Sequence, residues 1–295
     1  MPTAQRAAIA GAVVLLLAGT AHAGPAVGQF ELKTLESEPG MLEFQSQNAY
    51  SWGQPHRQTK ADPADPAELE YDDNTIIRQR HALEMEMGLS YYLKMRIGIE
   101  YEKERVDDPA SPYDADAFDD LKLSEVGAEV IGILVRRTGD GAGLGVVVEI
   151  EKPIEGSESA GVNMGPIIEI AKGPWLFSAV PMLVHAFGGD ENDSGNVDDK
   201  WDFAYAVQLA YEFSETWTLT VEAYGTVDRV FGSGNPSESD LIFGDFDQHR
   251  LGPILYYNFK TSPDGVEVAI GSGILTGLNN NTPDATLKLS VEVEF

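Results

Sequence analysis

The last ten residues of the chain alternate between apolar and polar side chains, and this pattern constrains the fold more than any other feature. Phe295, Val293 and Val291 share one face with two preceding leucines, whereas Glu294 and Glu292 lie on the other face. Strands of about ten residues with one apolar and one polar face are the building blocks of bilayer-spanning β-barrels. Any half-buried strand alternates in this way, so the prediction depends on the rest of the chain.

The rest of the chain repeats the pattern in twelve segments. They span residues 41–52, 78–91, 94–104, 121–135, 143–152, 162–171, 174–186, 201–213, 216–227, 247–259, 265–275 and 285–295. The even-numbered connections are short, such as residues 92–93, and the odd-numbered ones are long and polar, such as residues 53–77. Short periplasmic turns and long extracellular loops are typical of outer-membrane barrels. We therefore predict an all-β fold, a transmembrane antiparallel β-barrel of about 12 strands over residues 41–295.

The N-terminus has the features of a signal peptide. Arg6 supplies a positive charge, residues 10–19 are apolar, and Ala21-His22-Ala23 provides small residues for cleavage. The apolar stretch is too short to cross a bilayer as a helix. We therefore expect residues 1–23 to be cleaved on export and the mature chain to reach the bacterial outer membrane. Residues 24–40 are expected to form a periplasmic N-terminal segment, with a plug in the barrel mouth as the alternative.

Composition supports export and argues against some partners. The chain has no cysteine, which fits an exported protein stabilised by barrel closure and not by disulfides. Its net charge of −28, with no basic stripe, excludes nucleic-acid binding. The expected partners are outer-membrane lipid, lipopolysaccharide, the barrel-assembly machinery and a small-molecule solute. Phe295 is the predicted assembly signal, because a terminal aromatic residue marks the last strand of bacterial outer-membrane barrels.

The polar face of the strands predicts the lining of the barrel. Twelve tilted strands give a backbone radius of about 12 Å, and side chains narrow this to a bore suited to small solutes. The charges inside either form a structural ion-pair network or guide a polar solute. Acids outnumber bases, so we expect cation preference. The faces of residues 121–135 and 174–186 are ambiguous. The pore-lining candidates are Glu84, Glu86, Lys94, Arg96, Glu100, Glu102, Glu149, Glu169, Asp202, Gln208, Glu212, Glu222, Arg250, Glu267, Lys288 and Glu292.

Catalytic motifs of outer-membrane barrels are missing from the sequence. Barrel lipases use a His-x-Ser pair in which the imidazole takes the hydroxyl proton, and no histidine of the mature chain has serine two residues later. A rim-sited hydrolase built from His185, His249, Asp245 and Asp247 stays open as a third alternative, although polar residues at a wet rim explain them more simply. We do not expect an enzyme or a cofactor.

One acidic loop begins like a calcium-binding loop. Asp190, Asn192 and Ser194 match its first three ligand positions, but Trp201 stands where a bidentate glutamate should close the site. These residues are a weak candidate for a surface calcium site. A solvated acidic loop is the simpler interpretation.

Short motifs along the chain resemble one family. They are Gln29-Phe30-Glu31 with residues 40–44, Gly173-Pro174-Trp175, and the stretch from Gly277 to Phe295. Together they resemble the outer-membrane proteins named after the MetA pathway of phenol degradation. The resemblance implies an outer-membrane barrel that moves small, often aromatic, molecules, and it carries over no binding residues. We expect a passive channel for small solutes, with a sealed structural or adhesion barrel acting through its acidic surface loops as the alternative.

Overall fold

The computed structural model describes residues 30, 32–58, 70–106, 120–154, 160–187, 200–233, 247–261 and 265–295. These residues form twelve strands and one 3-10 turn, η3 (Val230–Gly232). The strands are β1 (Leu42–Gln58), β2 (Glu70–Ser90), β3 (Leu93–Val106), β4 (Lys122–Val135), β5 (Gly141–Pro153), β6 (Ala160–Lys172), β7 (Trp175–Phe187), β8 (Lys200–Glu212), β9 (Trp217–Val227), β10 (His249–Lys260), β11 (Glu267–Gly277) and β12 (Ala285–Glu294).

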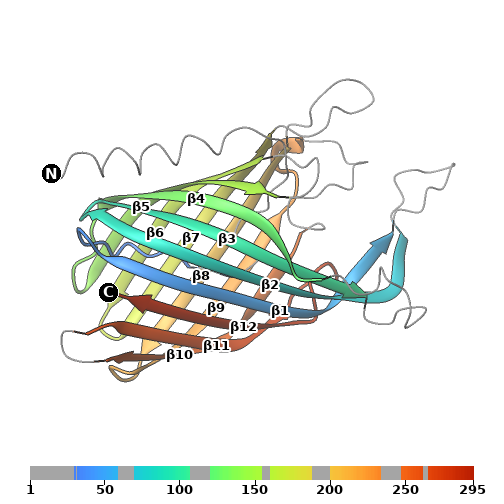
Figure 1. Ribbon diagram of the computed structural model, residues 1–295. Coiled ribbons are helices and arrows are strands. Elements are labelled where there is room, and N and C mark those ends of the chain that lie inside the picture. The colour runs from blue at the N-terminus through green and yellow to red at the C-terminus, as the bar shows by residue number, and fades with distance from the viewer. Residues whose placement is uncertain are drawn as a thin grey trace.

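The strands close into one antiparallel barrel, which confirms the predicted fold (Figure 1). Each strand pairs with its neighbours in sequence, and β1 closes the barrel against β12 in a register from Glu43↔Glu294 to Trp52↔Ala285. The short connection predicted at residues 92–93 lies one residue earlier, at Tyr91-Tyr92 between β2 and β3. In the described part of the chain, no helix has the length and apolarity needed to cross a membrane.

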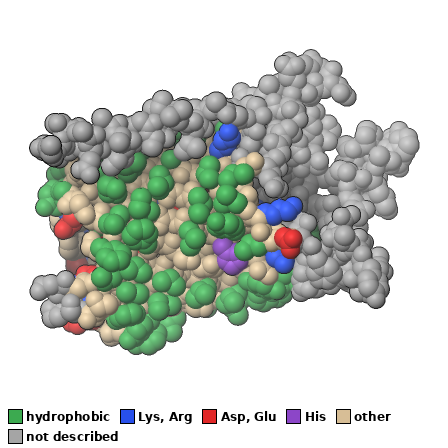
Figure 2. Space-filling view, in the orientation of Figure 1, with side chains coloured by type: hydrophobic (Ala, Val, Ile, Leu, Met, Phe, Trp, Pro, Cys, Tyr) green, Lys and Arg blue, Asp and Glu red, His purple; other side chains and the backbone are tan. Residues whose placement is uncertain are grey.

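Side chains alternate between the inside and the outside of the barrel. On β12, Lys288 is only 2% exposed, whereas its neighbours Leu287 and Leu289 are 40% and 42% exposed. Figure 2 shows hydrophobic side chains over much of the wall on the face in view. Exposed aromatic rings gather near the short turns, where Trp175 packs on Tyr211 with ring centroids 4.6 Å apart. This exterior has the apolar band and aromatic rim that bilayer-embedded barrels present to lipid.

The two strands with ambiguous sequence have apolar side chains on both faces. Ile131 and Ile133 of β4 point inward and are buried, whereas Leu134 is exposed on the outside. Val180 of β7 likewise points inward, and Phe177 points outward. The inward apolar side chains of these strands therefore form a hydrophobic cluster inside the barrel.

Two prolines and a glycine shape the contact between β6 and β7. Their register runs from Met164↔Leu183 directly to Ile168↔Ala179, so no Cα pairs are registered around Pro166 and Pro181. Proline cannot donate to the ladder. A Cβ atom at Gly165 would overlap the carbonyl oxygen of Pro181, so the two backbones approach closely at this point.

The N-terminal segment differs from the sequence-based expectation. Residue 30 and residues 32–37 extend along the inside of the barrel, where the alternative of a plug places them, whereas residues 38–40 are exposed and form the turn into β1. Phe30 and Leu35 join the interior hydrophobic cluster, and Lys33 reaches interior carboxylates. The physical reason is that these side chains have apolar and charged partners inside the barrel. Residues 1–29 and 31 are outside the described part of the chain, and the signal peptide stays a prediction. We call residues 30 and 32–40 the plug segment.

Candidate functional site

The barrel interior brings most of the pore-lining candidates together. Ten are buried inside: Glu84, Glu86, Lys94, Arg96, Glu149, Glu169, Asp202, Glu222, Arg250 and Lys288. Glu100, Glu102, Gln208 and Glu292 are partly buried, whereas Glu212 and Glu267 are exposed near the short turns. It stays a prediction that these side chains line a conducting path.

One cluster of ion pairs joins the plug segment to β2, β3, β4 and β5. The Nζ atom of Lys94 lies 2.8 Å from a carboxylate oxygen of Glu86, and Nη2 of Arg96 lies 2.7 Å from the other. Lys33 of the plug segment pairs with Glu129 and lies 3.5 Å from Glu149. Because all these groups are buried, the cations offset carboxylates that burial alone would penalise. We call this group the Lys33 cluster.

A second cluster surrounds Glu222 of β9. Its Oε2 atom lies 2.7 Å from Nζ of Lys288 and accepts a hydrogen bond of 2.6 Å from Tyr224. Its Oε1 atom accepts hydrogen bonds from Tyr256 at 2.8 Å and from Gln208 and Thr220 at 2.9 Å. Charge-assisted hydrogen bonds of this kind are stronger than neutral ones. Glu222 is completely buried, and its five donors fix the position of its carboxylate.

Further contacts fix the plug segment along its length. The backbone amide of Leu35 donates to Glu169 at 2.9 Å, and Nζ of Lys94 donates to Thr34 at 3.1 Å. Arg137, in the turn after β4, bonds Glu169 and Glu36 at 2.9 Å each. Partial burial lowers the pKa of Arg137, but these two carboxylates outweigh it, and its pKa is raised above the ordinary value. The segment is therefore bonded to the wall from the short-turn end inward.

The interior charges of the Lys33 and Glu222 clusters are arranged as ion pairs. Their role, as a structural network or as a guide for a polar solute, stays a prediction. The sequence missed Lys33 because the plug segment has no strand periodicity, and it missed Glu129 because β4 is apolar on both faces. The sequence signal for the inward face of β4 is the alternation of Glu125, Gly127 and Glu129.

The described rim residues contact aromatic rings, a hydroxyl group and a backbone amide. Nδ1 of His249 lies 3.0 Å from the Tyr205 hydroxyl, and His185 stacks on Trp201 with centroids 4.2 Å apart. The Asp247 carboxylate accepts a hydrogen bond from the backbone amide of Asp228. Asp245 is outside the described residues. Among the described residues no group of three or more histidine or acidic side chains is placed to hold a metal ion. The calcium candidates Asp190, Asn192 and Ser194 are also outside the described residues.

The C-terminal residue lies at the end of the closing strand. The backbone amide of Phe295 donates to the carbonyl of Leu42 at 2.9 Å. Its exposed ring meets the ring of Phe44 edge to face, with centroids 6.0 Å apart. Phe295 thus joins the seam between β1 and β12, and its role as an assembly signal stays a prediction.

Comparisons with known proteins support the fold. No protein-family model and no curated protein matches the chain, so the MetA resemblance stays a prediction. An outer membrane channel from Pseudomonas putida F1 matches with a TM-score of 0.59 and 10% identity, over 90% of this chain and 97% of that one. The NanC porin matches with a TM-score of 0.46 and 10% identity, over 86% and 98% of the two chains. The transport unit of the Escherichia coli autotransporter AIDA-I has a TM-score of 0.48 and 11% identity, over 92% and 94%. At this identity, the likeness to the Pseudomonas channel shows a shared fold.

Proposed function

We propose that this protein is an outer-membrane channel for small solutes and that the plug segment controls its bore. The observation that carries the proposal is a closed barrel with an apolar exterior and a charged interior. A bilayer requires a closed barrel with an apolar exterior, and a water-filled path requires a charged or polar interior. The likeness to an outer membrane channel from Pseudomonas putida F1 supports the same class of function.

The solute class and the partners are part of the proposal. The interior is narrow, so it suits small solutes, and the motifs that resemble the MetA family favour small organic compounds, including aromatic ones. The outer membrane, with its lipid and lipopolysaccharide, is the proposed location. The long connections would then face the outside of the cell, and the barrel-assembly machinery would insert the chain.

The plug segment makes the proposal specific. Lys33 is the cation that bonds the segment to Glu129 and Glu149 in the middle of the interior. Without the charge of Lys33, two buried carboxylates would lose a partner, and water would enter to solvate them. Solute passage is therefore expected to require the segment to shift from its place.

Conductance in planar lipid bilayers tests the function. The mature protein should show small, cation-preferring conductance because interior acids outnumber bases. Lys33→Gln should raise the mean conductance by loosening the segment. Lys260→Gln is the matched control, because Lys260 forms an exposed pair with Glu267 near a short turn, and it should behave like the wild type.

The result that would contradict the channel is electrical silence of both the wild type and Lys33→Gln while the protein is folded. The filled interior and its ion pairs favour the second candidate function in that case, a sealed barrel that acts as a structural or adhesion protein.

A further inference from the structure

A cavity beside the plug segment is lined by arginine side chains, although the chain as a whole is acidic. It lies between β1, β2, β9 and β10 and has an empty volume of about 490 Å³, including space open to solvent. Its lining includes Arg78, Arg80 and Arg250 and contains no Asp or Glu, but Glu102 outside the lining pairs with Arg78 at 3.2 Å and with Arg80 at 2.7 Å. In a chain with a net charge of −28, a cavity lined by three arginines and no acid is an unusual local environment.

Arg250 differs from the other buried cations in having no carboxylate partner among the described residues. It donates to the side-chain oxygen of Gln248 and, at 3.5 Å, to the hydroxyl of Thr286. Its guanidinium carbon lies 4.8 Å from the centre of the Phe30 ring. A guanidinium has five N–H donors, so these contacts leave donors available. A buried charge of this kind calls for an anionic partner.

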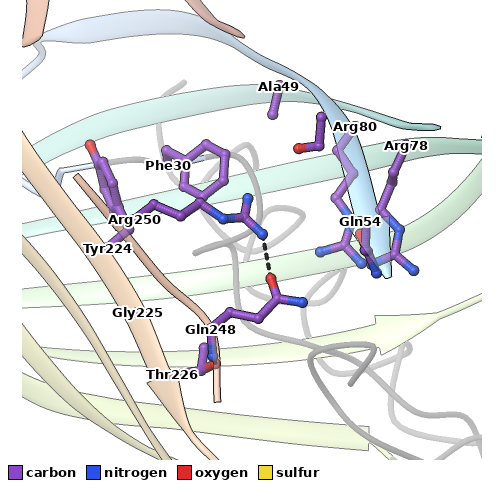
Figure 3. Close-up of a pocket in the computed structure, with 11 residues that line it drawn as sticks. Phe30, Ala49, Gln54, Arg78, Arg80, Tyr224, Gly225, Thr226, Gln248 and Arg250 are labelled. Atoms are coloured by element: carbon purple, nitrogen blue, oxygen red, sulfur yellow. Dashed lines mark hydrogen bonds between the residues drawn. The ribbon is translucent and has the colours of Figure 1, made fainter. Parts of the chain in front are cut away.

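Two amide groups in the same cavity also favour an anionic ligand. The side-chain nitrogens of Gln54 and Gln248 are buried and lack a hydrogen-bond partner within the described part of the protein. Figure 3 shows Arg250 reaching past Phe30 toward Gln248, with Gln54 lying near Arg78 and Arg80. Buried donors without acceptors are costly, and a bound anion would satisfy them together with the guanidinium.

We propose that this cavity binds the carboxylate of a small organic anion, with Arg250 as the principal ligand and Gln54 and Gln248 as further donors. A planar guanidinium can hold a carboxylate through two parallel hydrogen bonds. The rings of Phe30 and Tyr224 line the same cavity and provide an apolar surface for the body of the ligand. The site deepens the proposed function, since its ligand would be a solute of the channel, but binding itself does not require conduction.

The location of the cavity supports this role. Thr226 and Gln248, which line it, lie at the ends of β9 and β10 next to the long connection between these strands. Phe30 belongs to the plug segment, and it both lines the cavity and joins the interior hydrophobic cluster. An anion held by Arg250 would contact both the barrel wall and the plug segment.

Calorimetric titration of the folded full-length mature protein in detergent tests the site. Sodium benzoate is the probe, and benzamide is the neutral control of nearly the same shape. Benzoate should bind saturably with one site, and benzamide should bind at least about tenfold more weakly, because it cannot accept two charge-assisted hydrogen bonds from Arg250. Equal binding of the two compounds, or no binding of benzoate, would overturn the proposal without any variant.

Variants then assign the binding to Arg250. Arg250→Gln should weaken benzoate binding by about tenfold or more, whereas Arg250→Lys, which keeps the charge but not the planar fork, should lose less. Arg136→Gln is the matched control, because Arg136 is exposed outside the cavity beside Tyr91. Unchanged benzoate affinity in folded Arg250→Gln would also overturn the site. A wild type that conducts but does not bind benzoate would refute the site alone, and one that binds benzoate but never conducts would refute the channel alone.

Discussion

A single buried charge inside the barrel affects the free energy of unfolding more than the equivalent charge on its surface. Lys288 and Glu222 form a pair 2.7 Å apart in which both side chains are almost completely buried. Lys260 and Glu267 form a pair of the same residue types, but both side chains are more than half exposed. Removing one partner of a buried pair leaves an uncompensated charge in a medium of low dielectric constant, whereas water solvates a partner left at the surface.

Lys288→Met should therefore destabilise the barrel by about 3–5 kcal/mol. Lys260→Met should cost about 0–1 kcal/mol. Urea unfolding in lipid vesicles measures the free energy of unfolding of both variants. Adding Glu222→Gln to Lys288→Met should recover part of the loss, because the buried charge is then removed. Equal effects of the two lysine substitutions would show that Glu222 is hydrated and not held by its five donors.

At the level of elements, the sequence predicts the strands well because alternation is a local property. All twelve strands lie where the pattern places them. β1 and β2 are longer than predicted, since they extend through residues 53–58 and 70–77, which are largely polar. Backbone hydrogen bonds pair these extensions without an apolar face, so they leave no alternation to detect.

The plug segment and its contacts could not be predicted in the same way. Residues 32–40 have no strand or helix period, and their partners come from β4, β5 and β6, which are far away in sequence. Only closure of the barrel brings those partners together. The same is true of the arginine-lined cavity, because its residues come from the plug segment and four strands.

The close contact between β6 and β7 gives a prediction at this scale. Gly165→Ala should reduce the folded yield, because the new Cβ atom would overlap the carbonyl oxygen of Pro181. Gly132→Ala is the control, since a Cβ atom at Gly132 meets nothing within 4 Å. The measurement is the heat-dependent migration on a gel that distinguishes folded from unfolded barrels. Similar folded yields for both variants would mean that β6 and β7 are not in close backbone contact.

The whole molecule is a closed wall around an occupied interior. The β1–β12 pairing leaves no free strand edge, and the plug segment fills part of the interior through Phe30, Lys33 and Leu35. Closure supplies stability in a chain without disulfides. Because the plug segment occupies part of the interior, we predict that it must move for solutes to pass.

A reversible cross-link between the plug segment and the wall tests this claim most directly. A side-chain methyl of Leu35 lies 2.8 Å from the position of a Cβ atom at Gly143, so Leu35→Cys/Gly143→Cys places one thiol on the plug segment and one on the facing wall. The chain has no other cysteine, and Leu35→Cys alone is the control. We predict that the cross-link forms in the folded barrel, that the oxidised protein conducts less than the wild type in planar bilayers, and that reduction restores conductance. Equal conductance of the cross-linked protein before and after reduction would contradict this prediction.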